Sequence, residues 1–73
     1  MRLHELAGQY RDSSAACRMR VSALRRELST TMGSETQKIR LRRRITMLTE
    51  MARDANATAR YLESYYAKEK VND

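Results

Sequence analysis

The segment ETQKIRLRRRITMLTEMARDANATARYLESYYAK, residues 35–68, decides the fold that this sequence predicts. Apolar and small residues recur along it at alternating spacings of four and three, which is the pattern of a coiled-coil helix. Ser34 precedes the segment and Gln37 follows three residues later, a capping-box arrangement that favours a helix start. We therefore expect one helix over about residues 35–68. Its apolar stripe, called the seam below, comprises Leu41, Ile45, Leu48, Ala52, Ala55, Ala59, Leu62 and Tyr66.

A second apolar stripe, which faces the first and is counted with it as the seam, occupies the N-terminal part of the chain. Its members are Leu3, Leu6, Tyr10, Ser14, Cys17, Val21, Leu24 and Leu28. This stripe predicts a helix over about residues 3–30. A break near residues 8–14 stays open, because Gly8 disfavours a helix interior and the Asp-Ser-Ser segment at residues 12–14 can cap a new helix.

The link between the two predicted helices is short, at about residues 31–34. Gly33 is expected to end the first helix in the left-handed conformation that glycine adopts readily. A short link makes the helices fold back antiparallel, so the sequence predicts an all-α helical hairpin as a single domain over residues 1–73. Matching the stripes about the link places Leu24 near Leu41, Val21 near Ile45, and Cys17 near Leu48.

A chain of 73 residues with one cysteine has few ways to become stable. It can form no internal disulfide, no spacing of Cys, His and acidic residues suggests a metal site, and small domains are marginal alone. The second helix also carries a wider apolar arc than one hairpin can cover. We therefore predict a homodimer, an antiparallel four-helix bundle. Its expected interface residues are Met47, Met51, Tyr61 and Tyr65, with partial exposure on a monomer as the open alternative.

Positive charge is concentrated in the middle of the chain. The formal net charge is +6, and residues 18–44 hold nine Lys or Arg against two acidic residues. In a hairpin this segment forms the tip, where a basic surface attracts nucleic acid or an acidic protein. The alternative is that the charge serves only solubility. The candidate binding residues are Arg18, Arg25, Arg26, Lys38, Arg40, Arg42, Arg43 and Arg44.

These patterns favour a small binding protein over an enzyme. The sequence offers no acid–base pair and no glycine-rich phosphate loop, and its single histidine, His4, has no second ligand nearby, so we expect no catalytic residue, cofactor, metal or small-molecule substrate. The alternative function is a structural or adaptor protein that pairs through its seam with itself or with another protein's helices. No transmembrane-length apolar run or secretion signal is present, so we expect a cytoplasmic protein. DNA, RNA and protein remain open as partners.

Overall fold

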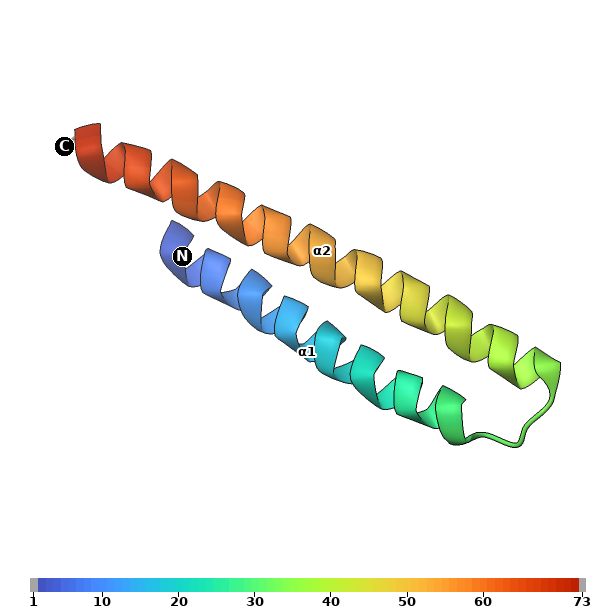
Figure 1. The fold of residues 1–73 in the computed structure, drawn as a ribbon. Coiled ribbons are helices and arrows are strands. Elements are labelled where there is room, and N and C mark those ends of the chain that lie inside the picture. Colours follow the sequence, from blue (N-terminus) through green and yellow to red (C-terminus); the bar gives the residue numbers. More distant parts are fainter. Residues whose placement is uncertain (1, 73) are drawn as a thin grey trace.

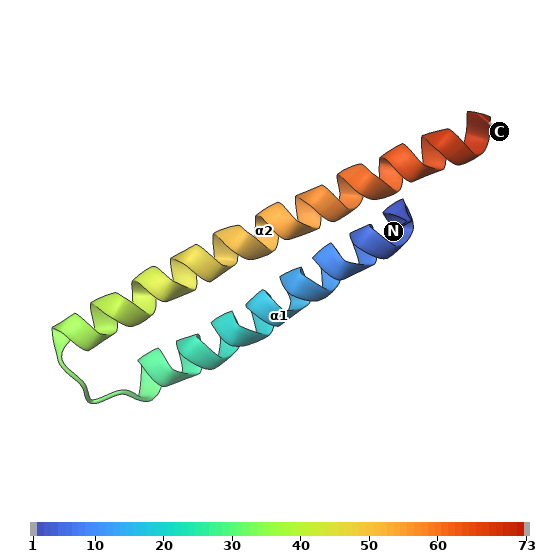
Figure 2. The ribbon, with the colours of Figure 1, turned by 180° about the vertical axis from the view of Figure 1, so that it is seen from behind.

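The computed structural model describes residues 2–72, with side chains for residues 2–65 and 67. Two helices make up nearly all of it: α1 spans Leu3–Thr30 and α2 spans Glu35–Asn72. They lie side by side, run in opposite directions and are joined at one end by a short turn (Figure 1, Figure 2). The prediction of an all-α antiparallel hairpin is confirmed. The C-terminal end of α2 projects beyond the start of α1.

Helix α1 is continuous through Gly8, so the possible break near residues 8–14 does not occur. The N-terminal part of its predicted stripe differs from the expectation, and Tyr10 of that stripe is exposed. Ala7 is buried, with 1% of its surface exposed, whereas Leu6 is only half-buried. Ala7 continues the alternation of four and three between Leu3 and Tyr10, so the heptad geometry takes precedence over side-chain size.

The turn caps α2 in the manner that the sequence predicts. The Gln37 backbone N–H donates to Ser34 Oγ at 3.3 Å, and the Ser34 N–H donates to Gln37 Oε1 at 3.2 Å. The expected left-handed conformation of Gly33 is wrong, since no described residue has a positive φ and α1 ends through an extended Thr31. A Cβ on Gly33 would overlap the Gln37 side-chain amide, so a larger residue there would require that side chain to move.

The two helices meet in the predicted register. Ser14 is buried in the contact and donates its hydroxyl to the Ala52 carbonyl oxygen at 2.8 Å, the one buried side-chain hydrogen bond between the described parts of the helices. Leu24 and Leu41 line the same groove between the helices, which confirms their predicted pairing. A hydroxyl that satisfies its hydrogen bond this way is accommodated in an apolar seam without an unpaired polar group.

The core is shallow. Its buried residues are Ala7, Ser14, Val21, Leu24, Ala52 and Ala59. The rod measures 59 × 16 × 13 Å, so it is one helix pair thick and leaves the other described residues of the seam partly exposed. Leu41, Ile45, Leu48 and Leu62 are consequently only half-buried, and the side chain of Tyr66 lies outside the described residues. Within the part of the chain described, neither helix is long and apolar enough to cross a membrane.

Candidate functional site

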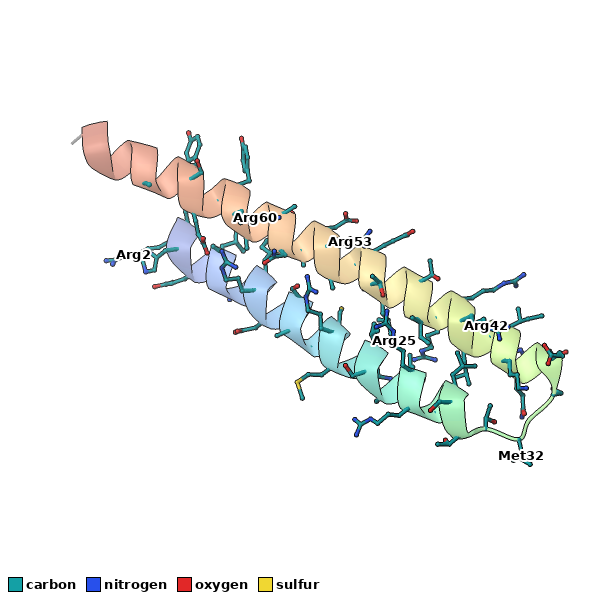
Figure 3. The ribbon with its side chains drawn as sticks, viewed as in Figure 1. Arg2, Arg25, Met32, Arg42, Arg53 and Arg60 are labelled. Carbon is teal, nitrogen blue, oxygen red and sulfur yellow. The ribbon has the colours of Figure 1, made fainter. Side chains whose placement is uncertain are left out.

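Two open grooves run between the helices, one on each side of the seam. Arg18 and Arg25 of α1 and Arg53 of α2 line the first groove, with Val21 and Ala52 at its floor. Arg25 lies nearer the turn and Arg53 farther from it, on the two helices that border this groove (Figure 3). The second groove is lined by Arg20, Leu24, Glu27, Thr31, Gln37, Arg40, Leu41 and Arg44. Since Val21 and Leu24 are neighbouring seam positions of α1, the grooves lie on opposite sides of the hairpin.

The first groove belongs to a longer arginine-bearing side of the molecule. Residues seven apart return to nearly the same side of a helix in a coiled coil. Arg11, Arg18 and Arg25 therefore share one side of α1, and Arg53 and Arg60 share one side of α2. Arg42 precedes Thr49, another residue of this groove, by the same seven residues. We call this surface the arginine face; its members are Arg11, Arg18, Arg25, Arg42, Arg53 and Arg60.

One arginine of this face is neutralised by an acid. Arg11 Nε and Nη2 donate to the two carboxylate oxygens of Glu63 at 2.5 and 2.7 Å, and Nη1 donates to Asn56 Oδ1 at 3.1 Å. The hydrogen bond from Arg11 lowers the pKa of Glu63, and the same bond raises the pKa of Arg11. This contact joins the open ends of the two helices across the arginine face.

Among the described residues, the other five arginines of the face have no acidic partner. The remaining acid on this side is Glu35, at the start of α2. Its Oε1 atom lies 3.6 Å from Lys38 Nζ. Within the described residues, no ion pair is formed by Arg18, Arg25, Arg42, Arg53 or Arg60. All five are exposed, so their guanidinium groups are available to an anion from solution.

The structure distributes the predicted tip residues over several surfaces. Arg18, Arg25 and Arg42 lie on the arginine face, whereas Arg40 and Arg44 line the opposite groove with Arg20. Arg26 and Arg43 are exposed on the outer sides of the helices, and Lys38 continues the seam in the first turn of α2. Sequence reasoning missed Arg11, Arg53 and Arg60, which the seven-residue spacing could have revealed.

The side of the hairpin opposite the arginine face carries exposed apolar residues. Met47 and Met51 of α2 are 51% and 50% exposed, and Tyr61 and Tyr65 are 69% and 48% exposed. Their spacing places all four on the side of α2 that also holds Arg40 and Arg44. We call these four residues the Met/Tyr face. The four predicted interface residues therefore share one uncovered side.

Other reactive side chains do not gather into a site. His4 is exposed near the N-terminus, and Cys17 is half-buried in the seam. Among the residues described here, no three His, Cys, Asp or Glu side chains are placed to hold a metal ion. The chain matches no known protein family, no curated protein and no solved structure.

Proposed function

We propose that the arginine face binds the phosphate backbone of nucleic acid, and that this chain is a binding protein rather than an enzyme. The observation that carries the proposal is the set of five exposed arginines on one side of the hairpin with no carboxylate partner in the described residues. Guanidinium groups make bidentate contacts to phosphate oxygens, and such contacts release counterions from the polyanion.

The arrangement of the arginine face favours a duplex over a single strand. Arg18 and Arg25 are seven residues apart on α1, as Arg53 and Arg60 are on α2, a rise of about 10.5 Å. This rise is close to three steps along one strand of a duplex, at roughly 3.4 Å each. None of the four tyrosines occupies a helix position on this face, so it lacks the aromatic platform on which unpaired bases stack.

Binding of a labelled, mixed-sequence DNA duplex, followed by fluorescence anisotropy over a range of salt concentrations, tests this proposal. The variant R18Q/R25Q/R53Q should bind about a hundredfold more weakly at low salt, and its salt slope should fall by about 2 to 3. The matched control R20Q/R26Q/R43Q removes the same charge from other surfaces and should keep both the slope and most of the affinity. Equal losses in the two variants, or no binding by the wild type, contradict the proposal.

A second copy of the chain is the partner that best fits the Met/Tyr face. In a single hairpin most described residues of the seam are only half-buried, and these four apolar side chains are about half exposed or more. A second hairpin packed face to face would cover them and complete an antiparallel four-helix bundle. We include this homodimer in the proposal.

Charge on the same side of α2 favours one orientation of that dimer. Arg44 and Asp54 lie three residues outside Met47 and Met51, on either side of the pair. In an antiparallel α2–α2 contact centred between the methionines, Arg44 lies opposite Asp54 of the partner subunit, twice by symmetry. This orientation also sends the two basic tips to opposite ends of the bundle, which separates like charges.

The second candidate function is an adaptor that pairs its Met/Tyr face with a helix of another protein. The same exposure of Met51 and Tyr61 favours it, because an uncovered apolar stripe suits any amphipathic helix. Light scattering distinguishes the two. The dimer predicts twice the chain mass of 8.5 kDa at low and at high salt. A monomer at both salt concentrations contradicts the homodimer and favours the adaptor.

A further inference from the structure

We infer that the dimer links two separate nucleic-acid duplexes, one on each outer side of the bundle. This inference rests on the proposed function and adds to it the number and direction of the binding surfaces. It follows from the placement of the arginine face and the Met/Tyr face on opposite sides of the same hairpin.

The opposite placement of the two faces comes from the phase of both helices. On α1, Arg18 and Arg25 line the groove beside Val21, whereas Arg20 and Glu27 line the groove beside Leu24. On α2, the side that bears Arg53 faces away from the side that bears Arg44, Met47 and Met51. When two hairpins share their Met/Tyr faces, both arginine faces must therefore point outward, in opposite directions.

A single short duplex cannot reach both arginine faces. Arg42 and Arg60 are 18 residues apart on α2, so each face extends about 27 Å along a straight helix pair. A duplex is stiff over about 150 base pairs, so a segment that lies along one outer side cannot bend round the rod to the other. Each dimer therefore takes two segments, and the assembly is bivalent.

Two methionines provide matched variants for the test. Met51 lies beside the centre of the proposed dimer contact, and Met19 is 74% exposed on the outer side of α1, away from both grooves. M51E places a carboxylate in the proposed dimer contact, whereas M19E makes the same charge change on an open surface. Neither residue belongs to the arginine face, so both variants keep the duplex-binding arginines.

The experiment captures a free duplex with an immobilised one. Beads carry a duplex of about 20 base pairs, protein is added, and a fluorescent duplex of different sequence follows. Wild type and M19E should capture the free duplex, with a maximum at intermediate protein concentration because excess protein saturates each duplex separately. M51E should capture about tenfold less, yet bind a single duplex in solution within about threefold of wild type.

The outcomes distinguish a failure of the two-duplex inference from a failure of the proposed duplex binding. Wild type that binds a duplex but captures none, or a saturated wild-type complex whose scattering mass holds one duplex per dimer, overturns the inference and leaves the proposed function standing. No binding of any duplex overturns both. Circular dichroism checks that M51E is helical. If it is not, the mass of the wild-type complex decides, with two duplexes per dimer as the expected result.

Discussion

The arginine face is built by both helices and the Met/Tyr face by α2 alone, yet the two flank the same seam with different chemistry. The arginine face holds guanidinium groups at seven-residue spacing with two acids, both already paired. The Met/Tyr face holds half-exposed apolar side chains with one acid, Asp54, among them. Arg20, Arg40 and Arg44 also lie on the side of the Met/Tyr face, in the groove nearer the turn. The position of a charged residue along the sequence is therefore a poor guide to the surface that it forms.

The largest effect, on the free energy of unfolding, is expected at Leu24, because both faces depend on the helix pairing to which it contributes. Leu24 is 3% exposed in the seam, so L24A should lower the free energy of unfolding by about 3 kcal/mol. Both duplex binding and dimerisation should weaken together, because both faces need the paired helices. Urea unfolding at fixed protein concentration measures the change.

The control for this variant removes an aliphatic side chain from the surface. Ile39 is 43% exposed in the first turns of α2, so I39A should change stability by less than about 1 kcal/mol. If L24A lost no more stability than I39A, the seam near the turn would not be what holds the two helices together.

The next largest effect should fall on the Met/Tyr face alone. In the proposed dimer M51E buries an unpaired carboxylate once in each subunit. A buried charge of this kind weakens association by about tenfold per copy, hence about a hundredfold for the symmetric pair. Analytical ultracentrifugation of M51E and M19E measures the dimer dissociation constant. Equal constants for the two variants would place the dimer contact elsewhere on the hairpin.

A smaller effect tests how the two Met/Tyr faces are oriented. R44E places like charges opposite each other if Arg44 faces Asp54 of the partner subunit, and it should raise the dimer dissociation constant about tenfold. The double variant R44E/D54R restores opposite charges and should recover most of the loss. A double variant no better than the single one contradicts the antiparallel contact centred between Met47 and Met51.

Local rules predicted most of the fold. The seam of α2 and the capping box of Ser34 and Gln37 follow from spacings of a few residues, and the structure has both. Two local details failed because they depend on neighbours in space. Ala7 is buried because α2 covers it, although a small side chain gives a weak apolar signal. Gly33 has no positive φ, since α1 ends through an extended Thr31 and the turn does not use the left-handed conformation.

The candidate site was harder to read from the sequence. Arg40, Arg42, Arg43 and Arg44 are consecutive or nearly so, and the turn of an α-helix sends them to different sides. The sides acquire meaning only when the second helix is in place, because it decides which residues flank a groove. The contact of Arg11 with Glu63 joins residues 52 apart, a separation that no local pattern encodes.

The smallest effect concerns the one arginine of that face with an acidic partner. Arg11 lowers the pKa of Glu63 in the folded hairpin through its hydrogen bond. A carboxyl whose pKa is lower in the folded than in the unfolded state stabilises the fold above its unfolded pKa. This contribution should decline as the pH falls below about 4.5, the ordinary value for Glu63, and disappear below the folded pKa.

Thermal unfolding of wild type and E63Q from pH 7 to pH 3 measures this contribution. The wild type should melt slightly higher at neutral pH, because exposed ion pairs contribute little, and the difference should close in acid. E50Q is the matched control, since Glu50 is exposed on α2 and forms no ion pair within the described residues. A difference between wild type and E63Q that stays the same from pH 7 to pH 3 would contradict a contribution from the carboxylate charge.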